Sequence, residues 1–279
     1  GAVSNFPSIP GLDNTLSSGK AMTSRDALEL EEIPKKLVIV GGGVIAIEFA
    51  TLFNALGTKV TLLQRSDHIL SGVENEIAIT LEKHLIEEGV HIITSTKIKY
   101  INQDGIVIEQ DGKEKSFSGD KYLISLGVKA QLSGLENLDL KLSKKGFVET
   151  NERLETNIKG VYALGDMNGK FPLAHVASAE GIVAVENIMG IDSILNYDII
   201  PFCIYSFPEI ASVGLTESQA KAAGYNVNVS KFPLSANGKA LAEGETLGFV
   251  KIISENQYGE ILGTHIMASH ATDMISEAT

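Results

Sequence analysis

An apolar strand that runs into three glycines and then into a helix is the feature that most constrains this fold. Lys36–Val40 is a continuous apolar segment typical of a buried strand, and Gly43–Leu56 has the apolar spacing of a helix. Thr58–Leu63 then supplies a second strand. Strand, helix and strand in this order predict a βαβ unit, and therefore an α/β fold.

The glycine turn within VIVGGGVIAIEFA has the spacing G-x-G-x-x-A, with Gly41, Gly43 and Ala46 at the defining positions. In a nucleotide-binding unit the first glycine permits the tight turn, the second leaves room for a pyrophosphate, and the small third residue lets helix and strand pack closely. The amides of Val44 and Ile45, at the start of the helix, would then face the anion. The turn predicts a Rossmann-like dinucleotide site; the alternative is a glycine-rich turn that only packs.

The end of the second strand bears on which nicotinamide nucleotide would bind. An acid there bonds the ribose 2′-hydroxyl of NAD, whereas a nearby arginine accommodates the 2′-phosphate of NADP. The strand ends in VTLLQR, so Gln64 stands in the place of the acid and Arg65 follows it. Arg65 is either a phosphate ligand or a solvated surface charge, and the sequence leaves the choice between NAD and NADP open.

Glu48 stands in the middle of an otherwise apolar helix. A buried carboxylate without a partner is costly. We therefore expect Glu48 either to reach solvent at the edge of the helix or to pair with a cation near a redox centre.

The rest of the first half continues the α/β pattern. Its opening is rich in Pro, Ser and Gly and predicts an ordered loop over residues 7–14, followed by a short helix that Ser24 caps and that ends at Glu31. The further elements expected up to residue 127 are a helix over 74–88, a strand in VHIIT, an antiparallel meander over 97–101, 105–110 and 114–118, and a final strand in KYLISLG.

The second half is irregular at first and rich in strands after residue 195. The expected elements are a strand at Gly160–Leu164, a helix at Ala174–Met189, strands in FCIYS, VNVSKFP, LGFVKIIS and GEILGTHIM, and a helix at Glu217–Ala223. This composition predicts a separate antiparallel domain with flanking helices. The last residues, ATDMISEAT, read as a helix without a C-cap signal, so we expect the sequence to be truncated there.

Net charge and cysteine count exclude several classes of function. A formal charge of -12 argues against nucleic acid or an anionic membrane surface as partner, and no apolar run approaches the ~20 residues that span a membrane. The start lacks a signal-peptide pattern, so a cytoplasmic location is expected. Cys203 is the only cysteine, which excludes an internal disulfide and a zinc cluster of several thiolates; we expect it to be buried and expect no metal site.

Several stretches together resemble the flavoprotein disulfide reductases, and most of all their dihydrolipoamide dehydrogenase branch. These stretches are GGGVIAIEFA, the strand end ISLG, GVYALGDMNGKFPLAHVASAEG, PFCIYSFPEIASVGLTESQA, and KFPLSANGKALAEGETLGFVKII with GEILGTHIM. The resemblance covers nearly the whole chain. An ordered set of this kind is very specific for the superfamily.

The resemblance implies flavin ligands in the second half. Gly165 and Asp166 of ALGD would bind FAD, with the Asp166 carboxylate accepting a hydrogen bond from the ribityl chain; the alternative is a turn-forming aspartate. Ala174 and His175 would begin a helix whose amino end faces the flavin ring, where the helix dipole stabilises negative charge. His175 taken alone would rather be structural. Gly127 of ISLG belongs to the cofactor site by the same resemblance.

The resemblance also divides the chain. Residues 1–30 would end an FAD-domain segment and form a connector, 31–127 would be the NAD(P)-binding domain, 128–195 a second FAD-domain segment, and 196–279 a truncated interface domain. The predicted fold is an α/β, Rossmann-like nicotinamide-binding domain joined to part of an FAD domain and to an α+β interface domain. In the family the interface domain makes a homodimer.

The implied activity is hydride transfer between NAD(P)(H) and FAD, coupled to exchange between a cysteine pair and a dithiol such as a lipoyl group. Glu48 would lie near the nicotinamide and flavin, paired with a lysine of the redox-active segment. The family's first FAD motif, its C-x-x-x-x-C pair and its His-Glu dyad do not occur in these residues. We therefore expect the chain alone to bind nicotinamide nucleotides weakly, to lack lipoamide reductase activity and to hold no catalytic residue except, by resemblance, Glu48.

Three departures from the lipoamide branch keep alternatives open. Ala46 stands where that branch has Gly, Gln64 where it has Glu, and VKAQ where it has a G-R-x-P-N loop near Gly127. One alternative is an NADP-dependent enzyme similar to glutathione reductase or mercuric reductase. The other is a non-catalytic nucleotide-binding or assembly domain, which the missing cysteine pair and dyad favour.

Overall fold

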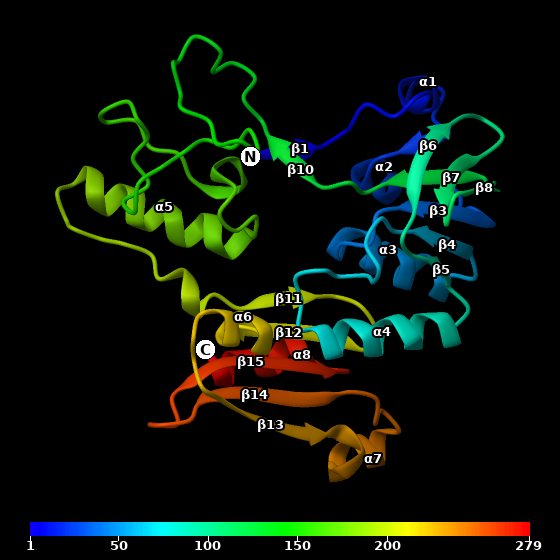
Figure 1. The fold of residues 1–279 in the computed structure, drawn as a ribbon. Helices are drawn as coiled ribbons and strands as arrows, with labels where there is room; N and C mark the ends of the chain where they lie inside the picture. Colours follow the sequence, from blue (N-terminus) through cyan, green and yellow to red (C-terminus); the bar gives the residue numbers. More distant parts are fainter. The chain divides into compact units, whose positions relative to one another are not determined.

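The computed structural model describes residues 1–279, and the chain passes back and forth between two units (Figure 1). One unit contains residues 1–5 and 127–200, and the other contains residues 6–126 and 201–279. Each unit is therefore assembled from segments that are distant in the sequence.

A five-stranded parallel sheet organises the first part of the larger unit. Its strand order is β2-β9-β3-β4-β5, and every neighbouring pair is parallel. Apolar runs suit such a sheet because both of its faces are buried: helices cover one face, and apolar residues between 98 and 108 pack on the other. The bounds are β2 (Ala21–Met22), β3 (Lys36–Val40), β4 (Lys59–Leu63), β5 (His91–Ile93) and β9 (Lys121–Ile124), with helices α3 (Val44–Ala55) and α4 (Asn75–Glu87). The predicted βαβ unit is confirmed as β3-α3-β4.

A separate three-stranded meander, β6-β7-β8, follows β5 and is antiparallel, as predicted. The turn between β7 and β8 contains Asp111 and Gly112, both with positive φ (52° and 71°). An Asp-Gly pair of this conformation matches the twist of a two-residue hairpin. The bounds are β6 (Lys97–Ile101), β7 (Ile106–Gln110) and β8 (Lys113–Phe117).

The antiparallel sheet of the carboxy-terminal segment has the order β11-β12-β15-β14-β13. The predicted strand-rich character is confirmed, but β12 and α7 were not predicted. The bounds are β11 (Phe202–Ile204), β12 (Glu209–Gly214), β13 (Val227–Pro233), β14 (Phe249–Glu255) and β15 (Ile261–Ala268), with α6 (Glu217–Ala222), η3 (Leu234–Ala236), α7 (Gly238–Glu243), α8 (Ala271–Met274) and η4 (Ile275–Ala278).

One apolar core joins the parallel sheet to this antiparallel sheet. Side chains of α3 and α4 share a buried cluster with Ile204, Ile210, Phe249 and Met267 of the antiparallel sheet. In Figure 1 α4 runs beside that sheet. The parallel sheet with its helices and the carboxy-terminal antiparallel sheet therefore share one hydrophobic core.

The smaller unit is built around one long helix and connecting loops. The amino-terminal strand β1 pairs antiparallel with β10, and Leu154 packs with Val183 and Ala184 of α5. The bounds are β1 (Ala2–Ser4), β10 (Val128–Ala130), η1 (Gly165–Asn168), α5 (Ala174–Ile188) and η2 (Tyr197–Ile199). No strand forms over 160–164; a single bridge between Glu155 and Tyr162 stands there instead, so that prediction is wrong.

Two details of the opening segment also differ from prediction. The predicted loop contains a short helix, α1 (Leu12–Ser17), with Leu12 buried. The next helix, α2 (Ser24–Leu28), is capped by Thr23 rather than Ser24, because the Thr23 hydroxyl accepts the Asp26 amide while the Asp26 side chain accepts the Thr23 amide. None of the helices is both long enough and apolar enough to cross a membrane.

Candidate functional site

Gly41 ends β3 in a conformation that only glycine adopts easily. Its φ is +117°, and a Cβ built on it would lie 2.1 Å from the carbonyl oxygen of Ser125. Ser125 follows the neighbouring strand β9 and donates its amide to Val40 at 2.9 Å. Two strands therefore approach each other so closely at the turn that a side chain cannot fit between them.

Gly43 is in the opposite situation. Its φ is −82°, and a Cβ built there would meet no atom within 4 Å. Gly43 is the N-cap of α3, and no side chain caps this end of the helix. The first amides of a helix carry partial positive charge and need an acceptor. The open space over an uncapped helix end is what a diphosphate requires.

The following residues place α3 against the sheet. Ala46 is fully buried, whereas Val44 and Ile45 are half-buried. Leu70 donates its amide to the carbonyl of Gly42 at 2.7 Å, which ties the turn to the loop after β4. The structure therefore brings Gly41, Gly43 and residues 44–46 together at the carboxyl end of the parallel strands, where open α/β sheets bind ligands.

Gln64 lies directly beneath this turn, and its polar atoms are used locally. Its Oε1 accepts the Arg65 amide at 3.0 Å, and its Nε2 donates to the carbonyl of His68 at 3.4 Å. A Cβ on Gly42 would come within 2.9 Å of the Gln64 side chain. Arg65 is exposed and its guanidinium forms no ion pair. The charged group available beside the turn is therefore a cation.

Glu48 has a partner of a kind that the sequence did not suggest. Its Oε1 accepts the backbone amide of Tyr205 at 2.9 Å, so that α3 is fastened to the segment that follows β11. The Glu48 side chain is half-buried. An amide donor stabilises the carboxylate without neutralising its charge, and Glu48 remains able to accept further bonds.

Gly165 and Asp166 lie in the other unit, in η1 just before α5. Gly165 has φ +69°, and a Cβ there would come within 3.1 Å of the Ala177 side chain. The Asp166 carbonyl accepts the Gly169 amide at 3.2 Å. The Asp166 carboxylate is half-buried and hydrogen-bonds no other group of the chain. A carboxylate presented in this way can accept hydroxyl groups of a ligand.

Ala174 and His175 are the first two residues of α5, and both are exposed. No side chain caps this end of the helix. Gly127 lies between β9 and β10 with φ +92°, and its carbonyl accepts the Asn5 amide at 2.9 Å. Five of the expected cofactor residues, namely Gly127, Gly165, Asp166, Ala174 and His175, thus belong to the smaller unit.

Glu180 of α5 is a buried acid that was not predicted to have a role. It is fully buried and receives hydrogen bonds from Gly165, Asn168 and Tyr197. A signal was present in AHVASAEG, because Glu180 follows the buried Val176 by four residues and so lies on the inward face of the helix. A carboxylate at such a position needs donors, which indicates a polar anchor.

Tyr197 and Lys170 complete the surroundings of Glu180. Burial and the hydrogen bond to Glu180 raise the pKa of the Tyr197 hydroxyl, which donates to the Glu180 carboxylate. Its ring stacks on Phe171, with centroids 5.8 Å apart, and the Lys170 ammonium lies 5.2 Å from the Tyr197 centroid. Burial lowers the pKa of the Lys170 ammonium.

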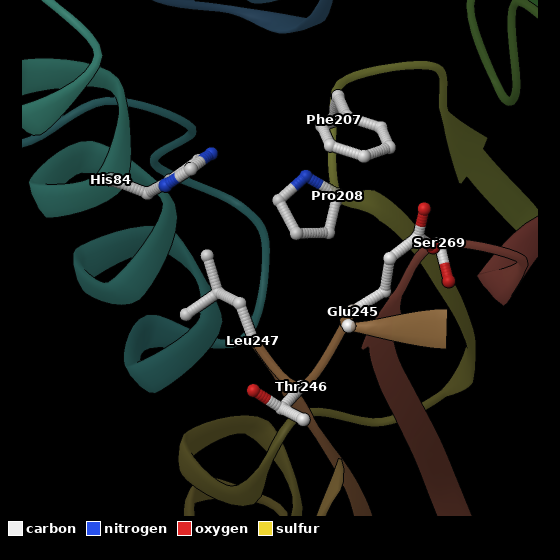
Figure 2. A pocket seen from close by; sticks show the side chains of 8 residues that line it. His84, Phe207, Pro208, Glu245, Thr246, Leu247 and Ser269 are labelled. Carbon is white, nitrogen blue, oxygen red and sulfur yellow. The ribbon is translucent and has the colours of Figure 1, made fainter. Parts of the chain in front are cut away.

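A hollow of about 210 Å³ lies between α4 and the antiparallel sheet. Figure 2 shows His84 facing Phe207, Pro208 and Leu247 across it. None of the predicted site residues lines this hollow. Phe207, Pro208 and Leu247 give it an apolar lining, and the predicted site residues lie at the glycine turn and at η1 instead.

Comparison with known proteins gives two family matches that together cover most of the chain. The pyridine nucleotide-disulphide oxidoreductase family matches residues 1–181. The dimerisation domain of pyridine nucleotide-disulphide oxidoreductases matches residues 200–279. These two matches take in the glycine turn, η1 with α5, and the antiparallel sheet.

Individual relatives agree with the family match. The chain is 43% identical to a dihydrolipoyl dehydrogenase of Bacillus subtilis (strain 168), over 97% of this chain and 58% of that protein. It is 39% identical to a dihydrolipoyl dehydrogenase of Geobacillus stearothermophilus, over 95% of this chain and 58% of that protein. The chain therefore spans a little more than half the length of these relatives.

Solved structures show the same fold. The HOCl-induced flavoprotein disulfide reductase RclA from Escherichia coli superposes with a TM-score of 0.88 at 26% identity, over 100% of this chain and 64% of that one. LpdA from Mycobacterium tuberculosis superposes with a TM-score of 0.83 at 28% identity, over 92% of this chain and 57% of that one. With its glycine turn, its uncapped helix α3 and its dimerisation-type sheet, the chain belongs to the pyridine nucleotide-disulphide oxidoreductase family.

Proposed function

We propose that these residues form the nucleotide-binding, second flavin-binding and interface parts of a dihydrolipoyl dehydrogenase-like flavoprotein. Its reaction is hydride transfer between a nicotinamide nucleotide and FAD, coupled to dithiol–disulfide exchange. The identity of 43% to a dihydrolipoyl dehydrogenase supports this reaction. The division at residues 30, 127 and 195 into connector, NAD(P)-binding, flavin and interface segments is part of the proposal.

The observation that carries the proposal is the open space at Gly43. A Cβ there meets nothing within 4 Å, although Gly41 and Gly42, the two residues before it, leave no such room. Backbone amides at an uncapped helix end stabilise a diphosphate both by hydrogen bonds and by the helix dipole. The residues at this turn therefore fit the pyrophosphate of a nicotinamide dinucleotide, with Val44 and Ile45 supplying amides and Ala46 the close packing.

The flavin part of the proposal rests on Asp166. Its unpartnered, half-buried carboxylate suits the hydroxyl groups of a ribityl chain, and the uncapped amino end of α5 suits the electron-rich edge of a flavin. FAD, when bound, supplies the two-electron carrier between the nicotinamide and a disulfide. This chain's own groups bind and orient the cofactor.

Partners and compartment follow from the same proposal. The substrate is a dithiol, with a lipoyl group the one that the relatives' name implies, and the dimerisation-type sheet pairs two copies in the full-length protein. A cytoplasmic location is part of the proposal.

Titration of NADH and NADPH into the wild-type chain and into the Gly43→Ala variant tests the nucleotide site. The added methyl group would occupy the space over the helix end, so the affinity is expected to fall by about tenfold or more. Gly181→Ala is the matched control, because Gly181 lies within α5 and a Cβ there also meets nothing within 4 Å. Equal affinity in the wild type and Gly43→Ala, or no binding by the folded wild type at millimolar nucleotide, would refute the proposal.

An NADP-dependent reductase is the second candidate, and Gln64 favours it. Gln64 puts an amide in place of the ribose-binding carboxylate, and its side-chain oxygen already accepts the Arg65 amide. Arg65 is exposed without an ion pair and can reach a 2′-phosphate. The comparison of the two nucleotides decides between the candidates.

A further inference from the structure

Glu180 presents both carboxylate oxygens to donors. Its Oε2 accepts the Gly165 amide at 2.5 Å, and its Oε1 accepts the Asn168 Nδ2 at 2.9 Å and the Tyr197 hydroxyl at 2.5 Å. The side chain is fully buried, so no water competes for these bonds. Charge-assisted bonds of this length are stronger than bonds between neutral groups.

The donors bracket the residue proposed to contact the flavin. Gly165 and Asn168 are the two ends of η1, and Asp166 lies between them. Asn168 cannot turn its amide around freely, because its Oδ1 accepts the Lys170 amide at 2.9 Å. Glu180 thus holds both ends of the short segment from the helix beneath it.

We infer that Glu180 is a positioning residue of the flavin site, whose carboxylate fixes the Gly165–Asn168 segment and thereby sets the place of Asp166. The inference rests on the proposed function for the ligand and on the contacts of Glu180 for the geometry. Glu180 touches no ligand itself; it acts through Gly165 and Asn168.

The arrangement requires a carboxylate rather than any polar group of similar size. In Glu180→Gln one end of the side chain becomes an NH2 group, and whichever way it turns, that group meets the Gly165 amide or the Asn168 amide, both of which donate. One buried donor is then left without an acceptor. When Asn168→Asp is added, the new carboxylate accepts a hydrogen bond from the NH2 group at position 180. The two side chains again form one donor and one acceptor, and the negative charge now lies at position 168.

The inference is tested by NMR, which measures hydrogen exchange at the Gly165 amide in four versions of this 279-residue chain. They are the wild type, Glu180→Gln, the double variant Glu180→Gln/Asn168→Asp, and Glu186→Gln as control. Glu186 lies on the same helix, is half-buried and makes no side-chain hydrogen bond, so its change alters the charge alone. Exchange at Gly165 is expected to quicken by about tenfold or more in Glu180→Gln, to recover in the double variant and to stay unchanged in the control.

Exchange in Glu180→Gln equal to that in Glu186→Gln, or an absence of recovery in the double variant, overturns the inference. A scalar coupling through the hydrogen bond, between the Gly165 nitrogen and the Glu180 carboxyl carbon, is measured on the wild type and needs no variant. Its presence is expected. Its absence overturns the inference even if Glu180→Gln fails to fold.

Titration of FAD into the same four chains separates this inference from the proposed function. The affinity is expected to fall about tenfold in Glu180→Gln and to recover in the double variant, while NADH binding stays the same in all four. Equal FAD affinity in all four chains overturns the positioning role. If the wild type binds no FAD although Gly165 exchange changes as expected, the proposed flavin site is refuted. The conclusion that Glu180 fixes the Gly165–Asn168 segment is then retained.

Discussion

The Lys251 ammonium of β14 lies 2.8 Å from a carboxylate oxygen of Glu74, the residue that precedes α4, and both side chains are 5% exposed. Glu217 of α6 joins them, with an oxygen 2.7 Å from the Lys251 Nζ and its amide 3.0 Å from Glu74. This buried group of charges fastens the nucleotide-binding layer to the antiparallel sheet. Glu76 lies at its edge, 3.7 Å from the same ammonium.

Replacing Lys251 by Met should strongly destabilise the larger unit. The change removes the cation and leaves the Glu74 carboxylate buried without its partner, for which a cost of about 3–5 kcal/mol is typical. The free energy of unfolding, measured in urea, would show the loss. Lys239→Ala is the control, because its pair with Glu243 is exposed and worth no more than about 1 kcal/mol. A Lys251→Met chain as stable as the control would contradict the role given to this group.

Stability should fall as the solution is acidified below about pH 5. Hydrogen bonds from Lys221 and Lys251 lower the pKa of Glu217 to about 2. Burial would raise the pKa of Glu74, but its bonds to Lys251 and the Glu217 amide outweigh burial and lower it. Both carboxyls titrate near ~4.3 in the unfolded chain, so their contribution is present above that pH and is lost as pH falls towards the folded values.

The decrease of stability in acid, here called the acid limb, can be assigned to Glu217 by substitution. Glu217→Gln should lose less stability than the wild type between about pH 5 and pH 2, because its contribution no longer titrates. Glu260→Gln, at an exposed position in the turn before β15, is expected to follow the wild-type curve. Identical acid limbs in the wild type and Glu217→Gln would rule out this source of the pH dependence.

His265 predicts a second pH dependence, at milder acidity. Burial lowers its pKa, and its ring bonds the Ser212 hydroxyl and the Leu215 carbonyl, at 3.0 and 2.9 Å, as a neutral imidazole can. The unfolded chain binds the proton from about pH 6.5 downwards, so stability should decrease below that pH. Urea unfolding of His265→Gln at pH 7 and pH 5.5 should show a smaller difference than the wild type. An unchanged difference would mean that the pKa of His265 is the same in the folded and unfolded chains.

Gly41→Ala should destabilise the fold, in contrast to Gly43→Ala. The methyl group would come within 2.1 Å of the Ser125 carbonyl, and the φ of +117° is itself unfavourable for alanine. A cost of at least about 1–3 kcal/mol is expected from the strain alone. Urea unfolding of both variants checks the contrast. Equal stabilities would show that the close approach of β3 and β9 is relaxed in solution.

Arg65→Glu should distinguish the two nicotinamide nucleotides. If Arg65 contacts a 2′-phosphate, the variant loses affinity for NADPH by about tenfold or more and keeps its affinity for NADH. Calorimetric titration of both nucleotides into wild type and variant measures this. Arg153→Glu, at a surface position in the smaller unit, controls for the change in net charge. Unchanged NADPH affinity would leave Arg65 as a solvated surface charge.

The strongest signals in the sequence were those set by local pattern. The β3-α3-β4 unit was predicted because its apolar periods are long and its glycines sit at the junction, and the Asp-Gly meander because alternation and turn chemistry agree. These features require no knowledge of distant partners. The sequence predicted that Gly41 permits the tight turn and that Gly43 leaves room for a ligand. The structure adds that the Ser125 carbonyl lies against Gly41, whereas the space over Gly43 is open.

The elements that were missed depend on contacts between distant residues. Strand β12 is rich in small residues and is defined by its pairing with β15, some fifty positions later. The sequence could place Glu180 on the inward face of α5, but it could not show that Tyr197 and Gly165 donate to it. In the same way the Tyr205 amide that Glu48 binds could not be foreseen from the pattern around Glu48. Helix α7, by contrast, carried a local signal in its N-cap Asn237.

The shared interior of α3, α4 and the antiparallel sheet has a consequence for how this molecule can be dissected. A nucleotide-binding piece excised at residue 127 would present to water the face that normally meets Phe249 and Met267, and would aggregate rather than report on coenzyme affinity. Because this shared core is closely packed, a larger side chain on one side of it requires a smaller side chain on the facing side. Substitutions in the two regions are therefore coupled.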